Sequence, residues 1–165
     1  MAEEYKPSEQ EITELHGKLV REAEAGGYHI NPDPEFARGL AEGLLVNIKR
    51  YGYMACPCRL ASGDRQKDLD IICPCDYRDP DLLEHGACYC ALYVSDDVLS
   101  GKMKLHTIPE RRGTVKAQQK ATAEFSKFSL PIWRCRVCGY LCARENPPEK
   151  CPICKAGRER FELFA

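Results

Sequence analysis

The sequence lacks an apolar run long enough to form a transmembrane helix, and it lacks an excess of charge of either sign. Its 24 Lys and Arg residues nearly balance its 25 Asp and Glu residues, which gives a formal net charge of -1. These absences argue against a membrane protein and against a general nucleic-acid-binding role. The first ten residues, MAEEYKPSEQ, are acidic and polar rather than typical of a signal peptide, so we expect a cytoplasmic protein.

Cysteine, by contrast, is abundant: the chain has 11 cysteines in 165 residues. Because the cytoplasm keeps thiols reduced, structural disulfides do not account for so many, and metal binding and catalysis become the leading explanations. The cysteines fall into two groups, six between residues 56 and 90 and five between residues 135 and 154. We therefore expect two separate cysteine sites.

The first fifty residues predict two amphipathic helices that act as scaffold. Ser8 and Glu11 form a capping-box signature, and apolar residues follow at three- and four-residue spacing until Gly26. A second amphipathic run follows Pro34, and its predicted apolar stripe consists of Phe36, Leu40, Leu44, Leu45 and Ile48. A further short helix is expected between the second and third cysteine pairs of the first group.

The C-terminal stretch WRCRVCGYLCARENPPEKCPICKAGRERFELF contains two C-x2-C pairs separated by twelve residues, 139–150. Two such pairs supply four thiolates in a tetrahedral arrangement, which suits Zn or Fe. The glycine and aromatic residue after the first pair, the proline inside the second pair and the RFELF ending resemble the rubredoxin domain of rubrerythrins. The resemblance implies a mononuclear Fe site, with Zn as the alternative, whose ligands are Cys135, Cys138, Cys151 and Cys154.

Two residues of this stretch stand apart from the ligand pattern. Cys142 is a fifth cysteine, which we interpret as a small packing residue. Lys155 occupies a position where rubredoxins usually have glycine, so we expect the turn after Cys154 to be made in another way.

The first cysteine group consists of three pairs: C-P-C at 56–58, C-P-C at 73–75 and C-Y-C at 88–90. Six thiolates exceed the four that a tetrahedral site or a four-thiolate iron-sulfur cluster takes. The natural division is four ligands and two remaining thiols, which suggests a dithiol/disulfide pair. The two cysteines of one pair are near the limit of about 7 Å for a relaxed disulfide, so the remaining thiols should come from different pairs. Spacing alone does not say which.

The three pairs resemble the signature of the catalytic subunit of ferredoxin:thioredoxin reductase, which reads C-P-C, C-P-C and C-H-C. The resemblance covers roughly residues 8–110 and implies a [4Fe-4S] cluster held by Cys56, Cys73, Cys75 and Cys88. It also implies an active-site disulfide between Cys58, the exposed nucleophile, and Cys90. Tyr89 replaces the middle histidine of the family, and His85 is the candidate for a catalytic, proton-handling role in its place.

Together these patterns predict two domains. We expect a mainly α catalytic domain built around an iron-sulfur cluster at residues 1–115, a linker at 116–129, and a small β or irregular rubredoxin-like metal domain at 130–165. The resemblance implies an oxidoreductase that takes electrons from ferredoxin and reduces the disulfide of thioredoxin-like proteins. The alternatives are a non-catalytic zinc- or iron-binding interaction protein and a one-electron carrier. Neither nucleic acid nor a membrane is expected as a partner.

Overall fold

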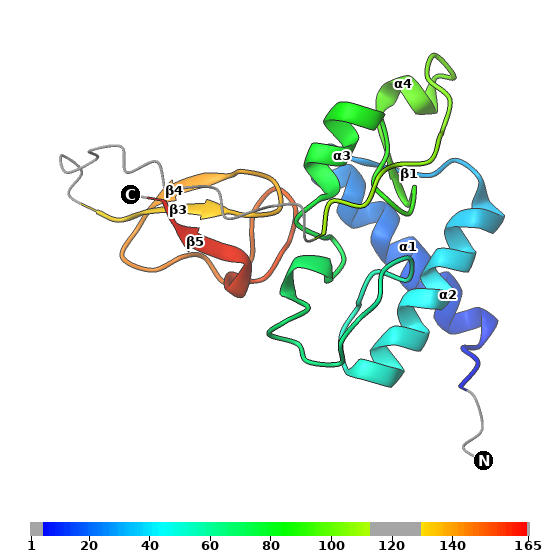
Figure 1. The fold of residues 1–165 in the computed structure, drawn as a ribbon, viewed down its shortest axis with the longest axis horizontal. Coiled ribbons are helices and arrows are strands. Elements are labelled where there is room, and N and C mark those ends of the chain that lie inside the picture. Colours follow the sequence, from blue (N-terminus) through cyan, green and yellow to red (C-terminus); the bar gives the residue numbers. More distant parts are fainter. Residues whose placement is uncertain (1–4, 113–129, 165) are drawn as a thin grey trace.

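The computed structural model describes residues 5–112 and 130–164, and these two parts differ in secondary structure (Figure 1). The first part is mainly helical, with α1 (Glu9–Ala25), α2 (Pro34–Tyr51), α3 (Arg78–His85) and the short α4 (Asp96–Leu99). The second part contains a small sheet of β3 (Ile132–Cys135), β4 (Leu141–Ala143) and β5 (Phe161–Leu163). The predicted fold class, a mainly α region with a small strand-rich module, is confirmed. The predicted linker, 116–129, lies outside the described residues.

Helix α1 begins where its capping box predicts. The backbone N–H of Glu11 donates to the Ser8 hydroxyl oxygen, and the backbone N–H of Ser8 donates to the Glu11 carboxylate at 2.7 Å. This reciprocal pair satisfies two N–H groups that a helix leaves without an internal partner. The residues at three- and four-residue spacing form the buried side of the helix, namely Ile12, Leu15, Leu19 and Ala23.

Helix α2 packs against α1, but its buried side is rotated from the predicted one. The predicted stripe is wrong at its two ends, because Phe36 and Ile48 are 45% and 37% exposed. The buried residues are Ala37, Ala41, Leu44 and Asn47. Alanine at the contact leaves room for α1 to approach closely, so the larger side chains lie at the edges of the interface, where Leu40 and Leu45 are partly buried.

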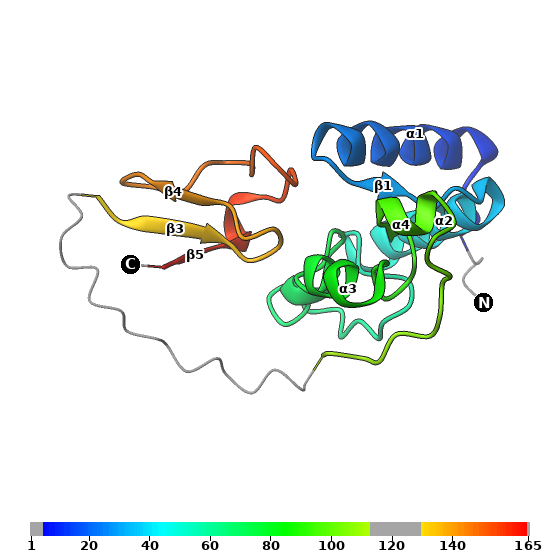
Figure 2. The same cartoon turned by 90° about the horizontal axis from the view of Figure 1, so that it is seen from above.

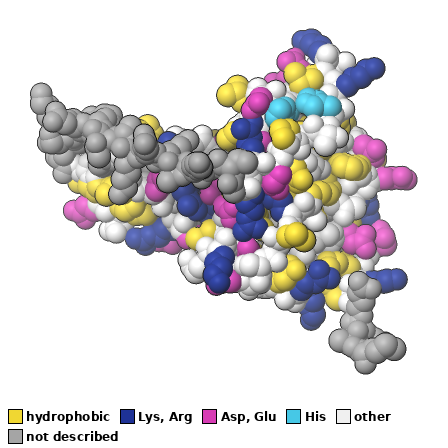
Figure 3. Space-filling model, in the orientation of Figure 1, with side chains coloured by type: hydrophobic (Ala, Val, Ile, Leu, Met, Phe, Trp, Pro, Cys, Tyr) yellow, Lys and Arg dark blue, Asp and Glu magenta, His cyan; other side chains and the backbone are white. Residues whose placement is uncertain are grey.

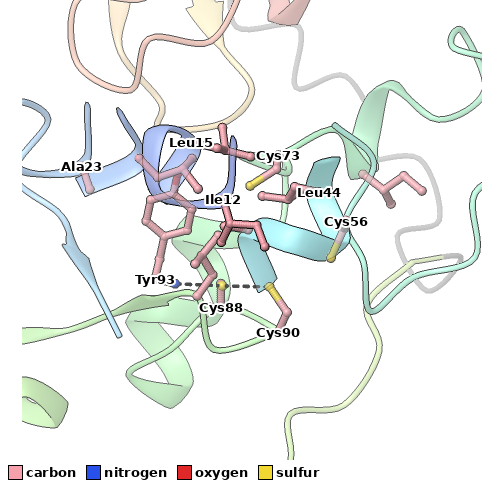
Figure 4. Close-up of a cluster of buried hydrophobic side chains, with 13 residues drawn as sticks. Ile12, Leu15, Ala23, Leu44, Cys56, Cys73, Cys88, Cys90 and Tyr93 are labelled. Atoms are coloured by element: carbon pink, nitrogen blue, oxygen red, sulfur yellow. Dashed lines mark hydrogen bonds between the residues drawn. The ribbon is translucent and has the colours of Figure 1, made fainter. Parts of the chain in front are cut away.

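The core of the helical region is formed largely by the cysteine loops. Strands β1 (His29–Ile30) and β2 (Tyr93–Val94) pair in an antiparallel manner, and β2 comes shortly after the third cysteine pair. In the close-up, apolar side chains of α1 and α2 lie in one buried cluster with the thiols of Cys56, Cys73, Cys88 and Cys90 (Figure 4). The thiols are thus removed from water by the scaffold helices that the sequence predicts.

The C-terminal module is an antiparallel sheet with the strand order β4-β3-β5. Its buried hydrophobic residues are mostly small or sulfur-containing: Cys135, Val137, Cys151, Cys154, Ala156 and Phe161. Cys142 lies on β4 opposite Trp133 on β3, and both side chains are partly buried against this core. Cys142 therefore packs in the module.

The turn after Cys154 differs from the expected one. Lys155 itself adopts the left-handed conformation, with φ 61°, so the backbone keeps the shape that glycine would give it. Its backbone N–H donates to the Cys151 carbonyl at 3.0 Å, and its ammonium group donates to the Pro152 carbonyl at 2.9 Å. These bonds hold a residue with a Cβ in a conformation that costs about 1 kcal/mol.

Replacing Lys155 with glycine should therefore stabilise the module. Glycine adopts positive φ without a Cβ clash, so we expect Lys155→Gly to raise the free energy of unfolding by about 1 kcal/mol. Denaturant unfolding of the metal-loaded protein measures the change. The matched control is Lys155→Ala, which removes the same side chain but keeps the Cβ. Equal stability of the two variants would show that the left-handed backbone carries no such cost.

Figure 2 shows the module beside the helical region. A buried ion pair attaches the two parts to each other. Arg160, in the short η2 (Arg158–Arg160), is 2% exposed and pairs with the Asp76 carboxylate. It also donates to the Ile72 carbonyl at 3.0 Å. Since Ile72 and Asp76 flank the second cysteine pair, the module is attached to the loop that carries Cys73 and Cys75.

Positive and negative side chains are interspersed on the face of the molecule shown in Figure 3, with hydrophobic side chains scattered between them. This mixture agrees with the near-zero formal net charge of the chain. No helix among the described residues is long and apolar enough to cross a membrane.

Candidate functional site

The four predicted metal ligands of the module converge on one point. The Sγ atoms of Cys135, Cys138, Cys151 and Cys154 all lie within 4.8 Å of one another. In a tetrahedral site with metal-sulfur bonds of about 2.3 Å, neighbouring sulfurs are about 3.8 Å apart. The distances of 3.6 Å between Cys135 and Cys154 and 3.5 Å between Cys138 and Cys151 are close to that value. These residues therefore fit a single ion held by four thiolates.

Tight turns place these thiols. After each C-x2-C pair, the next residue donates its N–H back to the carbonyl of the first cysteine: Gly139 to Cys135 at 2.8 Å and Lys155 to Cys151 at 3.0 Å. Both donors adopt positive φ, 76° for Gly139 and 61° for Lys155. The two turns are therefore alike in backbone shape although their sequences differ.

In the helical region, backbone hydrogen bonds hold the first two cysteine pairs side by side. The Cys56 N–H donates to the Ile71 carbonyl and the Cys73 N–H donates to the Met54 carbonyl, both at 2.8 Å. The connecting residues contain only one turn of 3-10 helix, η1 (Leu69–Ile71). This turn returns the chain to the first pair, so two cysteine pairs with 14 residues between them (59–72) meet at one site.

The third pair lies in a turn that leads into β2. The Ala91 N–H donates to the Cys88 carbonyl at 2.6 Å, and the Tyr93 N–H donates to the Cys88 sulfur at 3.3 Å (Figure 4). Ala91 adopts a positive φ of 55°, and its carbonyl accepts a hydrogen bond from the Asn31 side chain at 2.8 Å. The turn brings the Cys90 sulfur within 3.7 Å of the Cys88 sulfur.

Five of the six core cysteines line one small cavity together with Arg78 and Tyr93, namely Cys56, Cys73, Cys75, Cys88 and Cys90. Each of these five is at most 9% exposed, whereas Cys58 is exposed. Among the described residues, the core thiols do not form a group as compact as that of the module. A [4Fe-4S] cluster binds each thiolate at a different iron and so holds the sulfurs farther apart than a single ion does. The cavity therefore fits a cluster better than one ion.

Cys58 and Cys90 lie in different electrostatic environments. Hydrogen bonds with Cys56 and Cys90 lower the pKa of Cys58 to about 3 although burial opposes the shift, and the Arg59 guanidinium acts in the same direction. Hydrogen bonds with Cys56, Cys58 and Cys88, together with burial, raise the pKa of Cys90 well above its usual range. The surroundings therefore favour the thiolate at the exposed Cys58 and disfavour it at the buried Cys90.

Two buried arginines belong to this site and were missed by the sequence reasoning. Arg59 is 7% exposed and donates to the Cys75 sulfur at 3.4 Å. Arg78 is 1% exposed, lines the cavity, and lies 3.6 Å from the centroid of the Tyr28 ring. The position of Arg59, directly after the first cysteine pair, is a usable sequence signal. Arg78 has none, because a charged residue in a short helix usually faces water.

His85 is the last residue of α3 and is not among the residues that line the cavity. Its Nδ1 is 3.4 Å from Nε2 of His106, and its buried Nε2 has no hydrogen-bond partner among the described residues. Tyr89, by contrast, lies under the Arg59 guanidinium, with 4.3 Å between them. A catalytic role for His85 stays a prediction.

The two cysteine sites also share a cavity at the contact between the module and the helical region. It is lined by Cys73 and Arg78 on one side and by Cys154 on the other. Tyr28 packs against the buried clusters of both regions. The module is thus placed against the face of the core site that Cys73 occupies.

The fold and the two cysteine clusters are those of a metal-binding redox protein with two parts. The family model for the ferredoxin thioredoxin reductase catalytic beta chain matches residues 5–116, and the chain belongs to this family. The model for the rubrerythrin, rubredoxin-like domain matches residues 133–162. Both predicted resemblances are confirmed.

Two curated relatives match the C-terminal part of the chain. The chain is 52% identical to Reverse rubrerythrin-1 of Clostridium acetobutylicum over 29 residues, which cover 18% of this chain and 16% of that protein. It is 44% identical to a Putative rubrerythrin of Methanocaldococcus jannaschii over 39 residues, 24% of this chain and 19% of that protein. The chain therefore spans less than a fifth of each of these relatives.

Family membership gives the class of activity and of cofactor. The family consists of oxidoreductases that act on disulfides, and it binds a [4Fe-4S] cluster. The rubredoxin-like domain binds a mononuclear metal through four cysteines. The family is linked in general to ferredoxin and thioredoxin as partners.

Proposed function

We propose that this protein is an iron-sulfur disulfide reductase that takes electrons one at a time from ferredoxin and reduces the disulfide of thioredoxin-like proteins. Residues 1–115 form the catalytic domain and residues 130–165 the rubredoxin-like domain. The observation that carries the proposal is the contrast between the exposed Cys58 and the five buried cysteines beside it. A thiol that attacks another protein must reach the surface, whereas cluster ligands need protection from water.

The six core cysteines then divide between two roles, cluster binding and thiol exchange. Cys56, Cys73, Cys75 and Cys88 hold the [4Fe-4S] cluster, which supplies one-electron chemistry beside the Cys58–Cys90 pair. That position matters because ferredoxin delivers single electrons, whereas reduction of a disulfide takes two. Support comes from Cys90, whose sulfur lies 3.7 Å from that of Cys88 and whose pKa is raised by its neighbours Cys56 and Cys58.

The target disulfide is reduced in two thiol–disulfide exchange steps. In the reduced protein, the Cys58 thiolate attacks one sulfur of the target disulfide, forms a mixed disulfide, and releases the other target sulfur as a thiolate. Cys90 then gives up its proton as its sulfur attacks the Cys58 sulfur, which re-forms the Cys58–Cys90 disulfide and releases the second target sulfur. The target gains two electrons and takes up two protons, and two reduced ferredoxins restore the dithiol.

Electron transfer from ferredoxin to thioredoxin is thermodynamically favourable. Plant-type ferredoxins lie at about -400 mV and thioredoxin at about -270 mV, a difference of roughly 130 mV. For two electrons this corresponds to roughly 6 kcal/mol in favour of target reduction.

Metal and sulfide analysis of anaerobically purified protein tests this assignment. We expect about five Fe and about four acid-labile sulfides per chain, one cluster and one mononuclear iron. Zn in place of the mononuclear Fe would leave about four Fe and four sulfides. A colourless protein with zinc and no sulfide would overturn the proposal and favour a non-catalytic interaction protein.

A further inference from the structure

Arg59 links the three cysteine pairs of the core. It directly follows Cys58 of the first pair, and its Nη1 donates to the sulfur of Cys75 in the second pair at 3.4 Å. Its guanidinium lies 4.3 Å from the ring centroid of Tyr89, the middle residue of the third pair. Its side chain is 0% exposed. A single buried cation thus contacts all the segments that form the site.

Other segments hold this guanidinium in place. Nε of Arg59 donates to both carboxylate oxygens of Glu110 at 3.0 Å, and the Tyr77 ring centroid is 4.8 Å away. Glu110 comes from the chain that follows α4, so a segment remote in sequence fixes the orientation of the arginine. Such a fixed guanidinium loses little further freedom when it donates to a charged acceptor.

The third guanidinium nitrogen of Arg59 has an unmet capacity for hydrogen bonding within the described part of the chain. Nη2 is buried without a hydrogen-bond partner in the described part of the chain, and it lies 3.9 Å from Oδ2 of Asp81, beyond hydrogen-bond distance. A buried donor without a partner costs about 1–3 kcal/mol. The hydrogen bond from Nη1 to Cys75 offsets this cost when Cys75 is a thiolate, because that hydrogen bond is then charge-assisted and stronger.

A fixed cation beside a cluster thiolate changes the energy of reduction. Net charge and hydrogen bonds to the sulfurs set the reduction potentials of iron-sulfur clusters. Adding an electron adds negative charge, and a nearby guanidinium stabilises that charge most strongly where water is excluded. The cation therefore favours the reduced state and raises the reduction potential.

We propose that Arg59 is a positioning residue that raises the reduction potential of the core site through its hydrogen bond to Cys75 and holds Tyr89 beneath the same guanidinium. The inference rests on the proposed function, since it takes Cys75 to be a cluster ligand. Arg59 acts through its neighbours and forms no covalent bond in thiol exchange.

Redox titration of the holoprotein, followed by electronic and electron paramagnetic resonance spectra, tests this role. In Arg59→Gln, which removes the charge, we expect the equilibrium constant for the first one-electron reduction to fall about tenfold, a downward shift of about 59 mV. In Arg59→Lys, which keeps the charge but loses the planar fork, we expect a fall of about threefold. The control, Arg65→Gln, makes the same change at a partly exposed ion pair with Glu159 and should leave the potential unchanged.

Iron and sulfide are counted in each variant before titration. If Arg59→Gln fails to hold sulfide, Arg59→Lys decides: a lowered potential supports the inference and an unchanged one overturns it. Unchanged potentials in fully loaded variants overturn the role of Arg59 while leaving the proposed function intact. Conversely, the potentials of the Arg59 variants could shift as expected while the wild-type protein reduces no disulfide. That result would overturn the proposed function and leave the role of Arg59 standing.

Discussion

Cys58→Ser should abolish disulfide reduction while both metal sites remain loaded. Cys58 is the one exposed thiol among the six core cysteines, and serine cannot form a mixed disulfide. Loss of a nucleophile removes the covalent route, so we expect turnover with thioredoxin to fall by at least about 10³-fold. Because Cys58 does not line the core cavity, the iron and sulfide contents should stay at the wild-type level.

The measurement compares initial rates with reduced ferredoxin and oxidised thioredoxin, together with trapping of a mixed disulfide. The control is Cys142→Ser, which makes the same atomic change in the packing of the module and should keep normal turnover. A Cys58→Ser protein that reduces thioredoxin at the wild-type rate would show that another thiol is the nucleophile.

Arg160→Met should weaken the attachment of the module to the core. Arg160 is buried and pairs with Asp76, whose pKa burial raises even though Arg160 and Arg136 lower it. Removing one partner of a buried ion pair leaves the other charge without full compensation. We therefore expect the free energy of unfolding to fall by about 3 kcal/mol, measured by denaturant unfolding of the loaded protein.

The matched control is Arg134→Met, which removes an ion pair with Glu162 whose partners are 37% and 39% exposed, and which should cost less than about 1 kcal/mol. The double variant Asp76→Asn, Arg160→Met should recover part of the loss, because the uncompensated carboxylate is gone. Equal losses in Arg160→Met and Arg134→Met would contradict a buried attachment at Asp76.

The parts of the fold that the sequence predicts well depend on local chemistry. Ser8 and Glu11 cap α1 through bonds within one turn, and the module's four thiols converge because each C-x2-C turn places two of them. Such features need only neighbouring residues, so spacing and residue type suffice to find them.

The features that the sequence does not predict depend on contacts between distant segments. The side of α2 that is buried differs from the predicted side because α1 approaches closely at the alanines. The burial of Arg59 depends on Glu110, 51 residues away. Lys155 shows the converse: its residue type argues against a left-handed turn, but the surrounding cysteine loop imposes one.

The central claim is that the core cysteines couple single-electron transfer to disulfide reduction. The most direct measurement is an anaerobic assay of the metal-loaded protein with a known amount of reduced ferredoxin and oxidised thioredoxin. We predict one thioredoxin dithiol for every two ferredoxins oxidised, and none without the protein. Ferredoxin oxidation without dithiol formation would indicate an electron carrier, and no reaction by a protein with full iron and sulfide content would contradict the account.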